Sequence, residues 1–544
     1  MLKPQLDWSI TVFLAGSLAL VAFKLLTTPK SFVSRVPGPK SPSWLWGNML
    51  QLVFPRVYGE FEYEWLKTFG SVYTFRGVLG ETRLMVADPA ALQHILNDRT
   101  FLRSPPQWQI GKLVFGEGSV YCAEGDNHRR LRGALSPGFS TSVIRNFVPI
   151  FTEIAQRIVH QWIQDSPSGG RVNVCDVIDR ATLDIISEGA SRLWVTLSTR
   201  SHIPNTLWRK ATCTCCEIVF SIAGSSLFME IFRAAGFDRS KYDLLAEVAT
   251  PYIPTPLLRL FLYLPTTIFR ALRSFCEITD HLSSTLMSEK ADGSAEDMLG
   301  MLIKGMTGAR QSKTTPAELA EQMRVILIAG QDTGSDTLAW CLHELSKDPE
   351  YQIKLREEVL SARNNTAKVD YDSLPLLNAF LKEVLRVYAS GPYLERVAST
   401  DCVVPLSKSL VLTTGETVDK LVLRKGQYVA LGVASYHRSE QLWGTDALDF
   451  KPSRWLSSTS PCTGPALGPY ANLLTFSGGF RPCIGWRFAV LEMQVLLSEI
   501  VANFSVSPSL DPEDVVKPLY AGALVPITTK NKKGLVLNLQ AIGP

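Results

Sequence analysis

The sequence predicts a mainly helical domain with small β-sheets, preceded by one N-terminal membrane-spanning helix. Three observations predict this fold class: an apolar run near the N-terminus, two short strand-like segments within residues 71–86, and helical patterns over most of the remaining chain. The 544 residues are 46% hydrophobic, which is typical of a globular protein. The formal net charge of +4 is too small to predict a nucleic-acid partner.

The segment Trp8–Leu26 is almost wholly apolar, and its 19 residues would span roughly 28 Å as a helix. A cleaved signal peptide is the alternative, because Lys3 precedes the run. The run is long for a signal, however, and no small-x-small cleavage site ends it. Basic residues follow on its C-terminal side, which places the rest of the chain in the cytosol. We therefore expect a single-pass anchor in the endoplasmic reticulum membrane, with the main domain facing the cytosol.

Three parts of the chain follow from this pattern. Residues 1–27 form the anchor, residues 28–50 a basic, proline-rich hinge, and residues 51–544 one large domain. Two prolines flank a glycine in Val36-Pro-Gly-Pro-Lys40, which makes the hinge stiff and non-helical. After the hinge, Ser71–Arg76 and Glu81–Val86 are predicted strands, and Pro89–Asn97 is a predicted helix.

A further helix is predicted to start at Gly125. His128 and Arg132 lie four residues apart in it, so they share one face. Arg129 and Arg130 lie on other faces and could meet an acidic partner protein. A basic surface helix is the alternative interpretation.

The stretch Glu188–Glu217 has no clear periodicity and contains the cysteine cluster Cys213-Thr-Cys215-Cys216. A zinc site there would need a second Cys or His pair at ligand spacing, which the sequence lacks. The other cysteines are scattered, which favours a reducing compartment. A shifted reading frame or a mis-joined exon over Ala190–Glu217 would produce this pattern, and sequencing of the transcript tests that hypothesis.

Thr315-Pro-Ala-Glu318 predicts a strong helix start, because it combines a capping box with proline at the first helical position. The helix should run to about Lys347, and Met323–Ala329 is apolar on every face, which predicts burial. Polar or small residues then enter this buried stretch at Gly330, Asp332, Thr333 and Thr337. Buried polar groups need partners or a function. A core helix with incidental polar residues is the alternative.

Glu383 and Arg386 are i,i+3 neighbours in the predicted helix Pro375–Tyr388, so they can form an ion pair. Alone, such a pair is most often a surface salt bridge of little energetic value. The motif Phe450-Lys-Pro452-Ser-Arg454-Trp455 follows them and adds another arginine.

Cys483 lies in the loop Phe476-Ser-Gly-Gly-Phe-Arg-Pro-Cys-Ile-Gly485, before the apolar run Trp486–Phe504. Gly479 and Gly485 would let a flat ligand approach the backbone closely. Arg481 supplies a positive charge suited to a carboxylate. The start of the following helix should point free N–H groups at the sulfur and favour a thiolate. A reduced cysteine in the core is the alternative.

This loop resembles the haem-binding signature of the cytochrome P450 family, at Phe476, Gly479, Arg481, Cys483 and Gly485. Ala329-Gly-Gln-Asp-Thr333 resembles the oxygen-activation motif of the same family, and the motifs containing Glu383, Arg386 and Arg454 occur in the family order. The resemblance covers nearly the whole chain. It implies the cytochrome P450 fold for residues 51–544, as the catalytic domain.

The resemblance also implies residue roles. Cys483 would be the axial thiolate ligand of the iron of haem b, held in the loop that also contains Phe476, Gly479, Arg481 and Gly485. The propionates would contact His128, Arg132 and Arg396, with His128 standing where the family usually has tryptophan. Gly330 would leave room for dioxygen, and Asp332 and Thr333 would deliver protons. Gly334 stands where an accessory hydroxyl is common. Glu383, Arg386 and Arg454 would form a structural triad.

The expected activity is insertion of one atom of O2 into a hydrophobic small molecule, with electrons from a separate NADPH–cytochrome P450 reductase. The pattern looks fungal, which favours secondary metabolism and a terpenoid-like substrate. Sterol or fatty-acid hydroxylation, a haem-thiolate isomerase or dehydratase, and a non-catalytic haem-binding membrane protein are the alternatives. The candidate substrate-contacting segments are Ser104–Gly118 with Trp108 and Phe115, Phe220–Pro265, Met323–Ala329 and Ser390–Glu395.

Overall fold

The computed structural model describes residues 32–53, 55, 58–165, 169–191, 267–289, 315–366, 368–457, 459–520, 523–529 and 533–542, with single residues at 257, 259, 260, 263, 300, 303 and 304. Within these ranges, every helix is too short or too polar to cross a bilayer. The predicted anchor Trp8–Leu26, the cysteine cluster at 213–216 and most of Phe220–Pro265 lie outside the described residues.

Helices make up most of the described chain. The α-helices are α2 (Met49–Val53), α3 (Glu60–Phe69), α4 (Pro89–Asn97), α5 (Pro105–Val114), α6 (Gly125–Leu135), α7 (Thr141–Arg145), α8 (Val148–Asp165), α9 (Val174–Ser191), α15 (Thr267–Glu289), α17 (Pro316–Lys347), α18 (Pro349–Asn365), α19 (Pro375–Val387), α20 (Val433–His437), α21 (Glu440–Trp443) and α22 (Trp486–Asn503).

The strands are short. They are β1 (Val72–Arg76), β2 (Thr82–Val86), β3 (Phe101–Arg103), β4 (Gly170–Asn173), β5 (Leu394–Ala398), β6 (Cys402–Val411), β7 (Thr417–Leu423), β8 (Tyr428–Leu431), β9 (Phe504–Pro508), β10 (Val516–Tyr520), β11 (Leu524–Thr528) and β12 (Val536–Ala541).

The described strands form four small sheets. The five-stranded sheet has the order β1-β2-β8-β5-β3, in which β2 and β8 are parallel and the other pairs antiparallel. A three-stranded sheet has the order β4-β12-β9, and β10–β11 and β6–β7 form two-stranded sheets. The mainly helical fold with small sheets is therefore confirmed.

Local signals predicted several elements to within a residue. The side-chain oxygen of Thr315 accepts a hydrogen bond from the Glu318 backbone N–H at 3.2 Å, and Pro316 occupies the first helical position of α17. The cap satisfies one of the free N–H groups at the helix start, which explains why the helix begins there. It ends at Lys347, as the pattern predicts.

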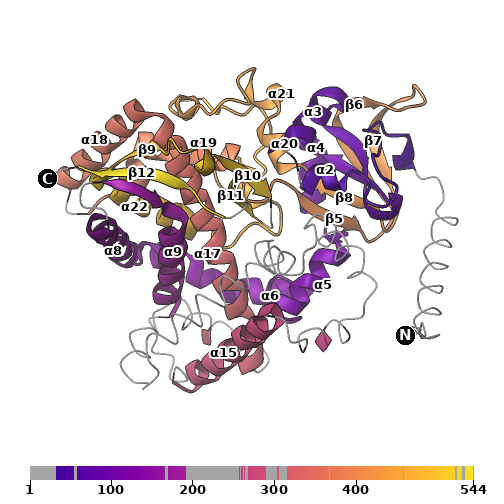
Figure 1. Cartoon of the computed structure of the whole chain (residues 1–544). Helices are drawn as coiled ribbons and strands as arrows, with labels where there is room; N and C mark the ends of the chain where they lie inside the picture. Colours follow the sequence, from indigo (N-terminus) through magenta and orange to yellow (C-terminus); the bar gives the residue numbers. More distant parts are fainter. Residues whose placement is uncertain are drawn as a thin grey trace, which may run out of the picture.

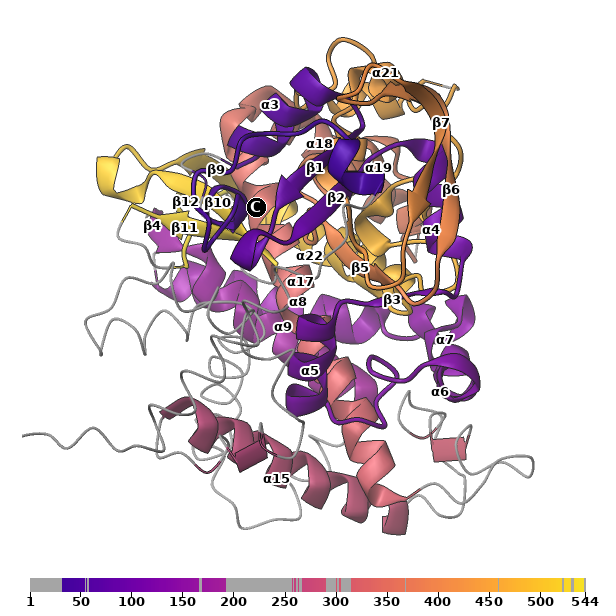
Figure 2. The ribbon, with the colours of Figure 1, turned by 90° about the vertical axis from the view of Figure 1, so that its right-hand side faces the viewer.

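Helix α17 crosses the middle of the molecule, with α15 at the end opposite α21 and the β6–β7 hairpin (Figures 1 and 2). It packs against α9, α15, α19 and α22, and against strand β11. Residues on α17 can therefore be reached from several elements that are distant in sequence.

The described part of the predicted hinge packs on the five-stranded sheet. Val33 and Val36 are buried, and the Thr74 backbone N–H of β1 donates to the Pro37 carbonyl at 2.9 Å. The Asn48 N–H donates to the Arg76 carbonyl at 2.7 Å. Residues 32–50 are thus part of the packing around β1.

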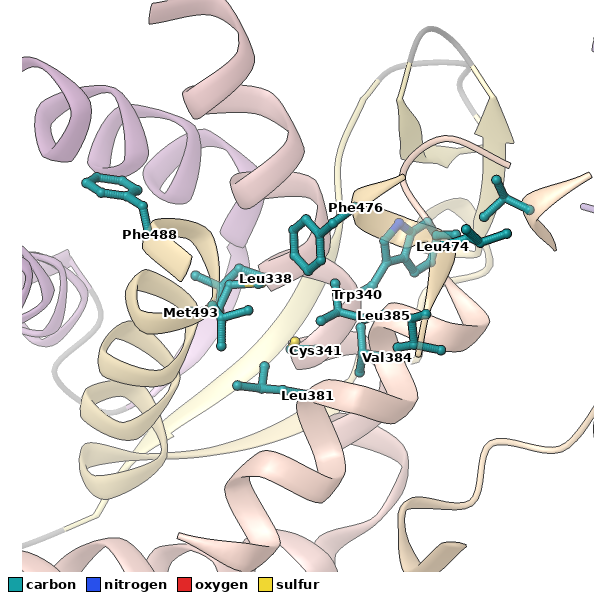
Figure 3. Close-up of a cluster of buried hydrophobic side chains, with 14 of the residues drawn as sticks. Leu338, Trp340, Cys341, Leu381, Val384, Leu385, Leu474, Phe476, Phe488 and Met493 are labelled. Carbon is teal, nitrogen blue, oxygen red and sulfur yellow. The ribbon is translucent and has the colours of Figure 1, made fainter. Parts of the chain in front are cut away.

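The central core lies where α17, α19 and α22 meet. Leu338 of α17, Leu381 of α19 and Met493 of α22 are buried there beside Phe476, which belongs to the cysteine loop (Figure 3). Burial of large apolar side chains stabilises the fold by about 1.5–3 kcal/mol each. Phe476 therefore ties the cysteine loop to the core.

Candidate functional site

The loop before Cys483 has an unusual backbone. Ser477 and Gly479 have φ of 58° and 66°, in the left-handed region that favours glycine. The Cys483 N–H donates to the Phe476 carbonyl at 2.8 Å, which closes the loop. A Cβ at Gly479 would lie 1.9 Å from the Leu96 carbonyl oxygen. Gly479 is therefore required by its φ and by the approach of α4, and the close approach of a flat ligand there stays a prediction.

The Cys483 side chain is exposed, although the thiol lies deep enough for burial to raise its pKa. A hydrogen bond from the Gly485 backbone and the charge of Arg132 act in the opposite direction but do not outweigh burial. The backbone N–H at the start of the following helix thus acts in the predicted direction, towards a thiolate, although burial outweighs it. A metal cation at the sulfur would reverse the balance, because a coordinating thiol is deprotonated.

A group of cations surrounds the side of α6 that faces this loop. Burial and, after it, the charges of Arg481, Arg132, Arg103 and Arg99 together lower the pKa of His128 to about 4. His128 is thus a neutral imidazole surrounded by guanidinium groups. The structure brings it near Arg132 and Arg481, as the sequence predicts.

Arg396 lies in the same group. Burial lowers its pKa to about 9, and the nearby charges of Arg103 and Arg481 contribute. Arg103 of β3 is its strand partner in the β3–β5 pair. The sequence analysis missed Arg103, because only the pairing of two strands almost 300 residues apart places it beside Arg396.

Arg481 has one carboxylate partner in the described chain. Its Nη2 donates to Glu124 Oε2 at 2.5 Å and to the Ala123 carbonyl at 2.7 Å. Its Nη1 is buried and has no hydrogen-bond partner among the described residues. The group of cations therefore carries more positive charge than the neighbouring described carboxylates neutralise.

The oxygen-activation-like motif lies in the middle of α17. Ala329 and Thr333 are exposed, although most of the helix around them is buried, so the prediction of burial is wrong at these two positions. The Thr333 hydroxyl donates to the Ala329 carbonyl at 2.9 Å. A Cβ at Gly330 would lie 2.4 Å from Ile186 Cδ1 of α9. A side chain at position 330 would thus meet Ile186, and the room that Gly330 leaves for dioxygen stays a prediction.

Four charged groups meet on the side of α17 that faces α9. Lys533 Nζ lies 2.9 Å from Asp336 Oδ1 and 3.0 Å from Asp179 Oδ1. Asp332 lies one helical turn before Asp336, on the same face. Burial raises the pKa of Asp332 well above its usual range; Lys533 opposes the rise, and Asp336 and Asp179 add to it. Burial also raises the pKa of Asp336 to about 6, against the effect of Lys533.

A fourth acid approaches α17 from α22. Glu492 is buried, and neither carboxyl oxygen has a hydrogen-bond partner in the described part of the chain. Burial raises its pKa well above the usual range. A Cβ at Gly334 would lie 3.1 Å from Glu492 Oε2. The position where an accessory hydroxyl is common thus faces a carboxyl group, which a search for local motifs did not single out.

Glu383, Arg386 and Arg454 form one buried network. Arg386 Nη2 lies 2.7 Å from Glu383 Oε1, and Arg454 Nε lies 2.9 Å from the same oxygen. Both Glu383 and Arg386 have fully buried side chains. The alternative of an isolated surface ion pair is therefore excluded.

The remaining predicted residues have local partners. Trp108 Nε1 donates to the Cys122 carbonyl at 3.0 Å, and Phe115 is buried against Tyr121. Arg129 pairs with Asp126 in an exposed helix turn at 2.8 Å, whereas Arg130 contacts Glu318 at the start of α17.

A family model and curated relatives match most of the chain. The family model described as Cytochrome P450 matches residues 36–190 and 195–533. The interruption at 191–194 falls inside Ala190–Glu217, where the reading-frame hypothesis stays a prediction.

Curated relatives span nearly the whole chain. Cytochrome P450 monooxygenase 205 of Postia placenta is 28% identical over 543 residues, covering 96% of this chain and 94% of that protein. Cytochrome P450 monooxygenase claO of Ampulloclitocybe clavipes is 31% identical over 487 residues, covering 86% of this chain and 85% of that protein.

Proposed function

The chain belongs to the cytochrome P450 family of haem-thiolate monooxygenases, and we propose that it binds haem b with Cys483 as the axial ligand, between the cysteine loop and α17. Membership of the family implies an oxidoreductase that uses haem, a redox partner and O2. The roles of individual residues in binding haem and in moving protons are our proposal.

The group of cations fits the two carboxylates of a haem. Arg132, Arg396 and Arg481 have one described carboxylate, Glu124, among them, and the buried Nη1 of Arg481 lacks a partner among the described residues. The neutral His128 would add an N–H donor. Buried charges are stable only when paired. Two propionate groups would supply the missing negative charge, and Arg103 would be an additional contact.

The exposed side chains fit the body of a haem. Cys483, Ala329 and Thr333 are exposed, yet they lie on elements that enter the core of the domain. A flat ligand between them would cover all three. When bound, the haem supplies the activation of O2 and the oxidising chemistry.

The residues of α17 would manage protons. Burial raises the pKa of Asp332 well above its usual range, which favours the protonated acid, and Thr333 is the next residue along α17. A protonated acid beside a hydroxyl can pass protons inward through water. This pair favours monooxygenation over an isomerase or dehydratase, because those reactions need no proton delivery to O2.

We also propose a substrate class, a redox partner and a membrane location. The fungal relatives support a hydrophobic substrate of secondary metabolism, with a terpenoid favoured over a sterol or fatty acid. We further propose electrons from the NADPH–cytochrome P450 reductase, and an anchor at residues 1–27 that holds the domain at the endoplasmic reticulum, facing the cytosol. Turnover with NADPH, the reductase and a panel of these substrates separates the alternatives, since an isomerase needs no reductase and a non-catalytic haem protein yields no product.

The Cys483→Ala variant tests the assignment of the axial ligand. The reduced carbon monoxide complex of the wild-type protein should show the red-shifted Soret band of a thiolate-bound haem, and the variant should lose that band. Cys402→Ala is the matched control, because Cys402 is a partly buried free cysteine on β6. An unchanged band in Cys483→Ala would end the assignment.

A further inference from the structure

Lys533 connects three segments that are distant in sequence. It precedes β12, and it pairs with Ile527 of β11 in an isolated bridge. The Gly534 N–H donates to the Pro526 carbonyl at 3.0 Å, and the Leu535 N–H donates to Asn173 Oδ1 at 3.0 Å. The backbone on which Lys533 stands is therefore fixed against both β11 and the start of α9.

From this position the ammonium group bridges two carboxylates of different exposure. The side chain of Asp179 is 28% exposed, that of Lys533 20% and that of Asp336 1%. The three groups thus form a continuous path of contacts at 2.9–3.0 Å from the solvent side of α9 to the buried face of α17. Asp332 lies one turn further along that face.

The charges of this cluster do not balance without a stored proton. The described groups that act on Lys533 include Asp179, Asp336, Asp332 and Cys175, with the exposed Asp176 further out. Asp336 is buried, and Asp332 and Asp179 are partly buried, so these three carboxylates beside one ammonium group would leave two uncompensated negative charges where little water screens them. Because Lys533 contacts Asp336 and Asp179 directly, the proton is best placed on Asp332.

We propose that Lys533 is a positioning residue for proton supply: its ammonium group pairs with Asp336, so that the proton of the cluster resides on Asp332, and its bridge from Asp179 to Asp336 is the route by which Asp332 is reloaded from solvent. In reloading, Asp179 first takes a proton from hydronium in the solvent. Lys533 then accepts that proton from Asp179 as it gives an N–H proton to Asp336, so the charges of Asp179 and Lys533 are restored and no electron moves. Asp336 then passes the proton one helical turn along α17 to Asp332. This inference rests on the proposed roles of Asp332 and Thr333.

Infrared spectra of the ferric holoenzyme test where the proton resides. Asp332→Asn should remove the band of a protonated carboxyl group from the wild-type spectrum. Lys533→Met should add such a band, and Lys533→Met/Asp336→Asn should lose it again, because Asp336 has lost its cation. Lys354→Met is the matched control, since Lys354 forms an exposed pair with Glu350. A Lys533→Met spectrum identical to that of the wild type would overturn the proposal.

Peroxide release tests the supply route. With NADPH, the reductase and dodecanoic acid as the probe, Lys533→Met should release more peroxide per NADPH than the wild type, and Lys533→Arg should restore the wild-type value. If Lys533→Met fails to fold, Asp336→Asn is the test variant for peroxide release, because it removes the next proton-carrying group of the same route. Wild-type peroxide release in the folded variant would overturn the route.

The role of Lys533 and the proton role of α17 can be tested independently. If Thr333→Ala and Asp332→Asn leave peroxide release unchanged, the proposed proton role of α17 is wrong. If they raise it and Lys533→Met does not, only the role of Lys533 is wrong.

Discussion

Two groups of buried charges, one around Glu383 and one around α17, differ in how well they are hydrogen-bonded. Arg386 donates to both oxygens of Glu383 and to three backbone carbonyls. Burial raises the pKa of Glu383, but the hydrogen bonds and charge of Arg386, with Arg454, lower it overall. Glu383 is therefore held ionised by its partners. We call Glu383, Arg386 and Arg454 the static network.

The acids around α17 show the opposite pattern. Asp332, Asp336 and Glu492 have raised pKa values because burial outweighs their partners. Neither oxygen of Glu492 has a partner in the described part of the chain. Well-paired charges stabilise one structure, whereas under-paired acids can hold and release protons. We therefore expect a structural role for the Glu383 network and a proton-handling role for the acids around α17, although both groups are buried and charged.

The largest expected effect is in the static network. Arg386→Ala should lower the free energy of unfolding by about 3–5 kcal/mol, because it leaves Glu383 and three carbonyls buried without their partner. Chemical denaturation measures this loss. Lys382→Ala, at the neighbouring partly buried position of α19, is the control. A loss below about 1 kcal/mol would mean that the network is not structural.

The next effect is a pH dependence carried by His437, which joins α19 to the cysteine loop. Its Nε2 accepts from the Leu474 N–H at 2.8 Å, and its Nδ1 lies 3.1 Å from the Arg386 carbonyl. Burial lowers its pKa to about 3, and Arg386 contributes.

The unfolded state therefore takes up a proton as the pH falls below about 6.5, while the folded state does not, so stability is lost on acidification. His437 should account for about 2 kcal/mol of lost stability between pH 7 and pH 5. Thermal unfolding of His437→Asn should show a shallower pH slope, and that of His160→Asn, at an exposed position, should match the wild type. Equal slopes in all three would contradict this role.

The smallest expected effect comes from giving the unpaired Glu492 carboxyl a hydrogen-bond partner, as the carboxyl of Glu383 already has. Gly334→Ser would place a hydroxyl within reach of the unpaired Glu492 carboxyl, whose flexible end can give way to the added Cβ at 3.1 Å. Alanine has the better helix propensity by about 0.5 kcal/mol. A hydrogen bond of about 1 kcal/mol should therefore make the serine variant at least as stable as Gly334→Ala. A serine variant that is less stable by the propensity difference would show that no such bond forms.

The sequence predicted the features that depend on local patterns. The cap at Thr315, the bounds of α17 and the pairing of Glu383 with Arg386 follow from spacing within one helix. The reasons for Gly330 and Gly479 were missed, because Ile186 and Leu96 come from other elements. Arg103, Glu492 and Lys533 were missed for the same reason: strand pairing and helix packing bring them to the site. Local patterns locate a motif but not the groups that surround it.

The most direct test compares the same chemical change in the two networks. Glu383→Gln and Asp332→Asn each replace a buried carboxyl with an amide, and haem content and peroxide released per NADPH are measured for both. We expect Glu383→Gln to lose stability and haem content, while the molecules that keep haem release peroxide as the wild type does. We expect Asp332→Asn to keep its haem and to release more peroxide. The reverse pattern, or the same loss in both variants, would contradict the division between a structural and a proton-carrying network.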